Sequence, residues 1–504
     1  MAPSVPVWSD EGMDPTSTTA RSLAAAIKDR SISATEALEA HLARIDAVNP
    51  IVNAVVTWDT DRAIARAAAA DAATAHGESW GPLHGVPMTV KDVWETAGMR
   101  TTCGAPEFAD HVPDHDAVAV ASLRSAGAVI FGKTNTPLYA GDVQTYNELF
   151  GVTNNPWDLT RTTGGSSGGA AAAVATSMTP FELGSDIGGS IRNPAHYCGV
   201  YGFKPTWGLI PTRGHIPGPP GTLVDTDVNC AGPLARSVDD LSLAFDVLAG
   251  ADPLHSSAWS LTLPPARPHR DVSGLRIALV LDDTGFPTSS ATRSRLRAAA
   301  DALTDAGALV EEQALPVTMD EMYRSWQALV LPVIGSGLPD DLYDAFAAIS
   351  ADQSDDAAGR ASAALVSTWR TWRRATQRRA LQRLRWADHF ERWDLVMTPV
   401  MPVPAFPHDV ETPMPMRTYD IDGTSHSHLE LVAWCGAIGA MLLPVVALPL
   451  GLSTGSTPTA PIGMPIGAQL IAADSTDLDL LAMAAAVDEV IGGYVPWSPT
   501  SLPA

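Results

Sequence analysis

The chain contains few cysteines and few basic residues. Its 504 residues include four cysteines, which lie far apart and show no C-x-x-C pairing, so neither a zinc site nor a disulfide framework is indicated. There are 32 Lys and Arg residues against 56 Asp and Glu residues, a formal net charge of −24. A nucleic-acid surface has to neutralise phosphates, so this balance argues against a nucleic-acid partner. It also favours neutral or cationic small-molecule substrates over anionic ones. We expect reduced thiols, no metal and no cofactor.

The sequence also lacks the patterns of an exported or membrane protein. Residues Met1 to Glu11 show no basic-then-apolar signal pattern. The longest apolar run, Gly436 to Leu450, is too short to span a bilayer and contains Pro444 and Pro449. We therefore expect a buried segment there, no membrane contact and a cytoplasmic location.

Helical and strand patterns alternate along the chain. Ser33 and Glu36 have the spacing of a capping box, which predicts a helix from there to about Val48, before Pro50. Further helices are predicted at about 61–75, 117–126, 170–175 and 292–306, and strands at 86–90, 129–132, 275–281 and 308–312. This alternation indicates an α/β fold with a largely internal sheet. Without an internal repeat or a clean linker, we expect one domain.

Two further segments have unusual compositions. The stretch from Ser367 to Trp393 is rich in Arg and Trp, a mixture found at RNA or membrane surfaces. We interpret it instead as an amphipathic surface helix whose arginines pair with the acidic majority. The stretch from Met401 to Met416 is rich in Pro and Met, which excludes a regular helix. It is either a loop lining a substrate mouth or an ordinary surface loop.

Three segments carry the residue types of a catalytic site. They are GVPMTVKD at 85–92, GGSSGG at 164–169, and 184–206, which begins GSDIGGSIR and ends KPT. Glycine pairs around serines expose backbone N–H groups that can hold an anion, either a phosphate or a developing oxyanion. A flexible linker is the plain alternative, but an apolar helix follows at once.

Other site types fit the glycine-rich segment less well. A P-loop needs Lys after its last glycine, where this chain has Ala170, and a dinucleotide fingerprint needs a different glycine spacing. Residues 164–168 formally match the G-x-S-x-G nucleophile elbow of an α/β-hydrolase esterase. That site also needs an acid and a histidine downstream, and His408, His426 and His428 stand in no distinctive context.

A lysine offers a different base for a serine. Serine is a weak nucleophile until a base takes its proton, and a buried, neutral lysine can serve because desolvation lowers its pKa. Lys91 follows the apolar run that ends at Val90, which suits burial. Considered alone, Lys91 would more simply be a strand-end lysine in an ion pair with Asp92.

Together the three segments resemble the amidase signature family, in which GGSSGG, GGSIR and KPT occur in this order. The resemblance is strong from Gly81 to Asp240. It implies that Lys91 is the general base, Ser166 the bridging serine with a cis peptide, and Ser190 the nucleophile. The implied oxyanion hole consists of the backbone N–H groups of Ile187, Gly188, Gly189 and Ser190. The residues expected to support the site structurally are Gly165, Asp186 and Arg192.

The resemblance also implies the architecture and the reaction. We expect one amidase domain over residues 1–504: N-terminal helices at 1–80, the signature core at 81–240, and the remainder with substrate-lining loops at 241–504. The implied fold is a large mixed central β-sheet covered by helices on both faces. The implied reaction is hydrolysis of the C–N bond of amides, through an acyl-enzyme or carbamoyl-enzyme intermediate and without a cofactor.

The sequence is compatible with more than one substrate class. The chain is similar to bacterial and metagenomic urethanases of the family, which cleave carbamates as well as amides. A glutamyl-tRNA amidotransferase A-type subunit working in a complex is an alternative, although residues 211–214 (PTRG) and 225–228 (DTDV) depart from the stretches we associate with it. A non-enzymatic interaction protein is a further alternative. The sequence predicts neither the oligomeric state nor the physiological substrate.

Overall fold

The computed structural model describes residues 14–216, 221–267, 271–338, 340–351, 357–454 and 463–498, so the N-terminal stretch Met1 to Glu11 lies outside it. Its centre is an 11-stranded sheet with the order β1-β3-β2-β8-β10-β9-β16-β17-β13-β11-β12. The strands of this sheet are β1 (Val55–Trp58), β2 (Pro87–Lys91), β3 (Val129–Thr134), β8 (Phe181–Asp186), β9 (Tyr201–Lys204), β10 (Cys230–Ala235), β11 (Arg276–Leu279), β12 (Leu309–Glu312), β13 (Leu395–Pro399), β16 (Val445–Leu452) and β17 (Pro465–Ile471).

The sheet is mixed and buried on both faces. β2 runs parallel to β3 and β8, and β11 runs parallel to β12 and β13, whereas the other pairs in the sheet are antiparallel. Every residue of β2, β3, β8, β9 and β10 is buried. Because successive side chains of a strand point to opposite faces, helices must cover both sides of the sheet. The fold is therefore α/β, as predicted.

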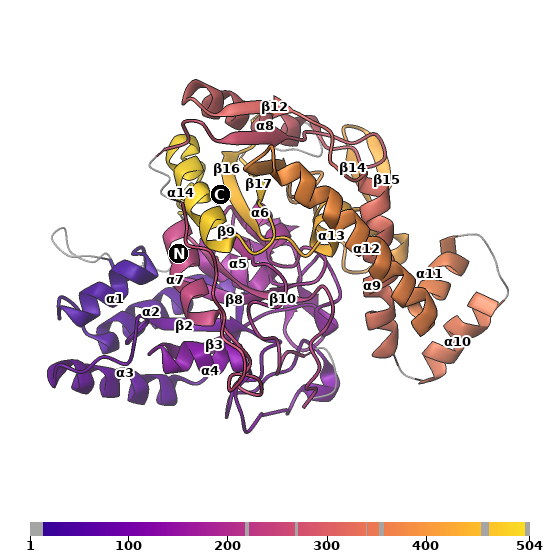
Figure 1. The fold of residues 1–504 in the computed structure, drawn as a ribbon. Helices are drawn as coiled ribbons and strands as arrows, with labels where there is room; N and C mark the ends of the chain where they lie inside the picture. The colour runs from indigo at the N-terminus through magenta and orange to yellow at the C-terminus, as the bar shows by residue number, and fades with distance from the viewer. Residues whose placement is uncertain are drawn as a thin grey trace.

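Helices surround the sheet (Figure 1). Three two-stranded sheets complete the strands of the described residues. The helices are α1 (Ala20–Lys28), α2 (Ala34–Val52), α3 (Thr60–Ala75), α4 (Val118–Ser125), α5 (Gly168–Ala175), α6 (Arg192–Cys198), α7 (Val238–Leu248), α8 (Ser290–Asp305), α9 (Met319–Ser336), α10 (Asp340–Ala351), α11 (Ala357–Leu365), α12 (Trp369–Phe390), α13 (Ala433–Ala440) and α14 (Asp477–Ile491). The small sheets are β4 (Tyr146–Asn147) with β5 (Gly151–Val152), β6 (Asn154–Asn155) with β7 (Asp158–Thr162), and β14 (Thr418–Ile421) with β15 (Thr424–Ser427).

The helices α9 to α12 lie on one side of the molecule, where α10 and α11 project away from the sheet (Figure 1). α9 packs on α12, α11 and α13. Its N-cap Thr318 and the third helical residue Glu321 form a complete capping box, which fixes where the helix begins. α9 packs on α13, and its Trp326 lies next to Gly188 in the loop between β8 and α6.

The first long helix, α2, has the predicted beginning but a later end. Ser33 and Glu36 make both hydrogen bonds of the capping box. The helix continues past Val48 to Val52 and includes Pro50. Proline lacks an N–H donor, so it removes one backbone hydrogen bond of the helix and disturbs the preceding turn. Near the end of a helix this loss is small, because few further turns depend on it. The αL residue Asn53 ends the helix instead.

The two segments of unusual composition differ in burial. α12 has a buried stripe at helical spacing, and three of its arginines pair with acids: Arg379 with Asp227, Arg383 with Asp474 and Arg385 with Glu321. The amphipathic-helix interpretation is therefore confirmed for this segment. Residues 401–405 are buried in the core, whereas Met414 and Met416 are exposed, so the Met/Pro-rich segment is a surface loop only in its second half.

The apolar run from Gly436 to Leu450 is buried, as predicted, in α13 and β16. Among the described residues, no helix combines the length and apolar character needed to cross a bilayer.

Candidate active site

Lys91 is the last residue of β2, and the topology places it beside β8. The two strands are parallel, with Thr89 opposite Glu182 and Val90 opposite Leu183. Their carboxyl ends therefore meet at one edge of the sheet, where the ligands of α/β proteins usually bind. The Gly/Ser segment that follows β8 begins at this edge.

The Lys91 amine is buried and faces two serines. Its Nζ lies 2.7 Å from Ser166 Oγ and 3.0 Å from Ser185 Oγ. The residue is 0% exposed, and burial lowers the pKa of Lys91 to about 7, although Cys103, Asp186 and Glu182 act in the opposite direction. Near neutral pH a substantial fraction of this amine is therefore unprotonated.

The ion pair between Lys91 and Asp92 that the sequence allowed does not form. Asp92 is buried, and its Oδ2 accepts hydrogen bonds from the backbone N–H and the hydroxyl of Thr102. Neighbouring residues at a strand end point in different directions, so Lys91 faces the serines while Asp92 faces away.

Ser166 lies in the glycine-rich loop before α5, and Asn193 of α6 holds that loop. The Asn193 side chain accepts a hydrogen bond from the Gly165 N–H at 2.9 Å and donates one to the Gly165 carbonyl at 2.5 Å. The Gly165–Ser166 peptide bond is cis. A Cβ on Gly165 would collide with the Asp142 carbonyl oxygen, so a larger residue would displace the loop.

Ser190 lies in the loop between β8 and α6, which the Asp186 carboxylate organises. The two carboxylate oxygens of Asp186 accept hydrogen bonds from the N–H groups of Gly189, at 2.8 Å, and Ile191, at 3.1 Å. Arg192 forms a buried ion pair with Asp186 at 2.8 Å. Burial alone would raise the pKa of Asp186, but Arg192 outweighs it and holds that pKa at about 2.

The backbone donors of this loop differ in what they contact. The N–H groups of Gly188 and Ser190 make no hydrogen bond with any residue that the structure describes, whereas the Gly189 N–H donates to Asp186 Oδ1. The N–H groups of Gly188 and Ser190 can therefore donate to a ligand. The Gly189 N–H could do so only after its hydrogen bond to Asp186 is broken.

Apolar side chains adjoin the loop on the side of α9. Ile187, Trp207 and Trp326 are partly buried and pack on one small cluster. The buried members of that cluster are Val228, Leu329, Val330, Ala375 and Leu442. Ile187 and Trp326 are partly exposed and in contact with each other at the loop that carries Ser190, so they can offer an apolar contact to a substrate.

Ser185, Asn193 and Trp326 belong to the site but were not identified from the sequence. Ser185 precedes Asp186 directly, so its position at the end of a strand beside Lys91 was the available signal. Asn193 follows Arg192 by one residue, yet an asparagine in a helix gives no sign of which loop it holds. Trp326 is 139 positions from Ile187, to which it donates a hydrogen bond, and no local pattern connects the two.

Other chemistry-bearing groups do not form a second centre in the described ranges. The four cysteines are free and buried. Among the described residues, no cluster of three His, Cys, Asp or Glu side chains could hold a metal ion. Among the described residues Ser166 makes no hydrogen bond to a histidine, and its Oγ accepts one from the Lys91 amine.

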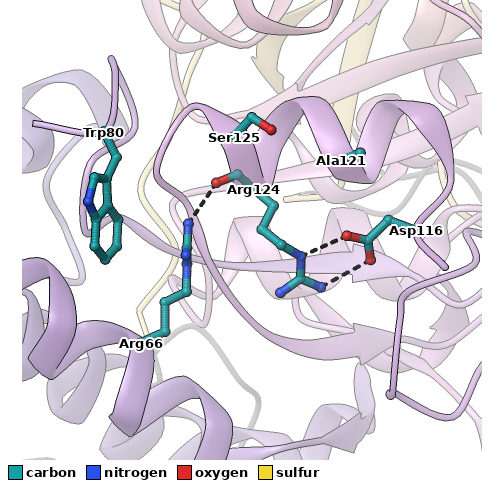
Figure 2. Close-up of a pocket in the computed structure, with 6 residues that line it drawn as sticks. All are labelled: Arg66, Trp80, Asp116, Ala121, Arg124 and Ser125. Atoms are coloured by element: carbon teal, nitrogen blue, oxygen red, sulfur yellow. Dashed lines mark hydrogen bonds and ion pairs between the residues drawn. The ribbon is translucent and has the colours of Figure 1, made fainter. Parts of the chain in front are cut away.

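A surface hollow is lined by residues of α3, α4 and the segments next to them (Figure 2). Its charged groups are already engaged: Arg124 binds Asp116 through two nitrogens, and Arg66 donates to the Arg124 carbonyl while its guanidinium lies over the Trp80 ring. Arg66 therefore caps one carbonyl at the end of α4, and the hollow contains none of the serine or lysine groups of the site.

Known proteins resemble the chain over nearly its whole length. A family model described as Amidase matches residues 36–481. The A-type subunit of glutamyl-tRNA(Gln) amidotransferase from Moorella thermoacetica is 35% identical in an alignment 493 residues long, which covers 94% of this chain and 96% of the relative. A structure of a vestigial protein complex that reveals the origins of an s-triazine catabolic enzyme has a TM-score of 0.79, 29% identity, and coverage of 95% of this chain and 100% of that one.

A bacterial aryl acylamidase of the amidase signature family is a further structural neighbour, with a TM-score of 0.75 and 25% identity over 96% of this chain and 97% of that one. The family match spans far more than half of the 504 residues and includes all three glycine-rich or lysine-bearing segments. The chain therefore belongs to the amidase signature family and is an amidohydrolase that cleaves C–N bonds.

Proposed function

We propose that this chain hydrolyses amides and carbamates with Ser190 as nucleophile, Ser166 as proton relay and Lys91 as general base. The observation that carries the proposal is the 2.7 Å hydrogen bond between the buried Lys91 amine and Ser166. Ser166 lies in the loop before α5, and Ser190 lies in the loop between β8 and α6. A lysine whose pKa is lowered to about 7 can accept a proton at neutral pH, which an ordinary surface lysine cannot do.

The first half of the reaction forms the acyl-enzyme. Ser190 Oγ attacks the substrate carbonyl carbon while its proton passes to Ser166 Oγ and the Ser166 proton passes to the neutral Lys91 amine. A new C–O bond forms, and the carbonyl oxygen becomes an oxyanion. The proton then returns through Ser166 to the substrate nitrogen, the C–N bond breaks, and the amine leaves.

Water completes the cycle by the same proton path. It attacks the ester carbonyl and gives its proton through Ser166 to Lys91. The proton then returns through Ser166 to Ser190 Oγ as the C–O bond to Ser190 breaks, which releases the acid and restores the serine. For a carbamate whose C–N bond breaks, Ser190 carries an alkoxycarbonyl group, and its hydrolysis gives a carbonic monoester. Both halves of the cycle need the same relay and no redox change.

The oxyanion is best stabilised by the loop that carries Ser190. This assignment is supported by the N–H groups of Gly188 and Ser190, which have no partner among the described residues. Ile187 is the residue next to Gly188 in the same loop. The Gly189 N–H is engaged with Asp186 Oδ1 and contributes mainly to the shape of the loop. Losing one such donor typically lowers the rate ~10²–10³-fold.

The substrate is best described as neutral and apolar next to the carbonyl. Partly exposed Ile187 and Trp326 beside Ser190 support an alkyl or aryl group there, and the net charge of −24 disfavours an anionic one. The relation to an aryl acylamidase supports aryl amides. The carbamate part of the proposal rests on the resemblance to urethanases.

A turnover panel tests this proposal. The purified chain is assayed against matched aryl amides, aryl carbamates and esters that share one acyl group, together with Ser190→Ala. We expect hydrolysis of amides and carbamates and a loss of about 10⁶-fold in Ser190→Ala. A phosphonofluoridate should label Ser190; a label on Ser166 would instead support the nucleophile-elbow alternative. Activity retained in Ser190→Ala would refute the assignment of the nucleophile.

A second candidate function is that of an amidotransferase A-type subunit. The 35% identity to such a protein over nearly the full chain favours it. The two functions differ in what the chain does alone: an amidohydrolase turns over a simple amide without a partner, whereas an amidotransferase component would have to pass ammonia to an acceptor in its complex. Ammonia transfer to glutamyl-tRNA with added partner proteins, combined with weak turnover by the chain alone, would favour the second candidate.

A further inference from the structure

Hydrogen bonds fix several peptide groups of the loop from Asp186 to Ser190. One of these hydrogen bonds is donated by α9, which is far from the loop in the sequence. The Gly188–Gly189 peptide is held through its N–H by Asp186 Oδ1. The Gly189–Ser190 peptide is held through its carbonyl by the N–H of Asn193, at 2.7 Å. Asp186 lies within this segment, and Asn193 lies three residues after its end.

The Ile187–Gly188 peptide is held differently. Its carbonyl, that of Ile187, accepts a hydrogen bond from the indole N–H of Trp326 in α9 at 2.8 Å. A peptide group is planar and trans, so its C=O and N–H point in opposite directions. Fixing the Ile187 carbonyl on the α9 side therefore fixes the direction of the Gly188 N–H, which has no partner among the described residues.

The Trp326 ring is itself held in place. It lies parallel to the Tyr323 ring, with 5.6 Å between centroids and 8° between planes, and the Tyr323 hydroxyl donates to the Leu429 carbonyl at 2.7 Å. A Cβ on Gly188 or on Gly436 of α13 would lie 3.0 Å from the ring. The indole therefore lies in close contact with both glycines and has little freedom to rotate.

From this geometry we propose that Trp326 is a positioning residue for catalysis: its indole N–H orients the Gly188 N–H that stabilises the oxyanion. This rests on the proposed function, because it assumes that Ser190 is the nucleophile. It assigns to α9 a role in the chemistry that none of the three glycine-rich or lysine-bearing segments reveals. It also predicts that a Cβ on Gly188, which would lie 3.0 Å from the Trp326 ring, would press on the ring and shift it or the loop.

Trp326→Phe tests the proposal, because it removes the N–H donor but keeps an aromatic ring for apolar contacts. The matched control is Trp434→Phe. The Trp434 indole N–H also donates to a backbone carbonyl, that of Phe286 at 3.2 Å, and the residue lies in the adjoining core without a hydrogen bond to the loop. The measurements are kcat and KM on a neutral aryl amide and the rate of Ser190 labelling by a phosphonofluoridate.

We expect Trp326→Phe to lower kcat and the labelling rate by between ~10-fold and ~10²-fold, with KM changed less than about twofold and the pH midpoint of activity unchanged. Trp434→Phe should keep wild-type kcat. Rates are referred to the enzyme fraction that finally takes up label, so that partial misfolding does not imitate the effect. Wild-type kcat and labelling rate in Trp326→Phe would overturn the proposal.

Gly188→Ala tests the same contact from the loop if Trp326→Phe does not fold. The backbone angle of Gly188 is not in the left-handed region, so the strain of the new Cβ arises mainly at the Trp326 ring. We expect a comparable loss of kcat, and unchanged kcat would overturn the inference. If the wild-type chain took up no label at Ser190, the proposed function itself would be refuted.

Discussion

At the scale of single residues, the environment of Lys91 decides its chemistry. The same side chain on the surface would be a cation with a pKa of about 10.4. Here the amine is fully buried, the nearest acids do not pair with it directly, and two hydroxyl groups are its hydrogen-bond partners. Desolvation of the charged form then exceeds the attraction of the surrounding acids, which is why a neutral amine is available near pH 7.

The pH dependence of kcat/KM follows from this state of Lys91. Below its folded-state pKa of about 7 the amine is protonated and cannot accept the Ser166 proton, so activity should be low and should rise as pH increases through about 7. The profile is measured with a substrate that does not ionise between pH 5 and 9. A flat profile over that range, or one that falls with pH, would contradict the assignment of Lys91 as base.

Replacing the base should reduce activity without unfolding the chain. Lys91→Ala removes the proton acceptor and should lower kcat by ~10²–10⁴-fold. Lys133→Met is a matched control, because Lys133 is also buried but donates to Thr96 and Thr101 rather than to a site serine. Circular dichroism of both variants checks folding. Full activity in Lys91→Ala would leave the base unidentified.

At the scale of elements, the turn between β8 and α6 depends on one buried ion pair. Asp186 binds two N–H groups of the turn and Arg192, which in turn donates to the Cys435 carbonyl and to Gln469. The pair therefore joins the loop of Ser190 to α13 and β17. A charge this deeply buried is tolerated only while its partner is present.

Asp186→Asn should consequently destabilise the fold as well as the site. It leaves the Arg192 guanidinium buried without a counter-charge, which typically costs about 3–5 kcal/mol of unfolding free energy. Asp320→Asn is the control, since its pair with Arg324 is largely exposed and should contribute little. Urea unfolding measures both variants. Equal stability of Asp186→Asn and wild type would mean that the pair is not required for the fold.

The sequence predicted those parts of the fold and the site that depend on local pattern. The capping box at Ser33, the buried run from Gly436 to Leu450 and the amphipathic α12 all follow from short-range spacing. The end of α2 was placed too early, because the effect of Pro50 depends on how many turns follow it. The catalytic residues themselves stay a prediction, one that the 2.7 Å contact of Lys91 with Ser166 supports.

The contacts that the sequence did not predict are tertiary contacts between distant elements. Asn193 contacts Gly165 from 28 positions away, and Trp326 contacts Ile187 from 139 positions away. Asn193 makes two hydrogen bonds with Gly165 and Trp326 makes one with Ile187, and only the sheet order and the packing of α9 bring these elements together. Patterns of glycine and serine indicate where a loop can bind an oxyanion, but not which side chains hold that loop in place.

At the scale of the whole molecule, the net charge of −24 acts on every approaching substrate. Summed surface charge alters the local concentration of charged ligands, and salt screens that effect over ~10 Å at 0.1 M. The core of the site is different, because its acids are buried and Asp186 is paired with Arg192. The charge should therefore influence encounter more than chemistry.

The effect on encounter can be separated from an effect on chemistry with three aryl amides that differ only in a distant substituent. One substituent is neutral, one is a carboxylate and one is a quaternary ammonium group. At low salt kcat/KM should be lowest for the anion and highest for the cation, with the differences narrowing several-fold as salt is raised to 0.5 M. Values of kcat should differ little among the three, because the substituent lies outside the reacting groups. Sucrose at matched viscosity controls for diffusion. A salt-independent order of the three would place the selectivity in direct contacts within the pocket rather than in the surface charge.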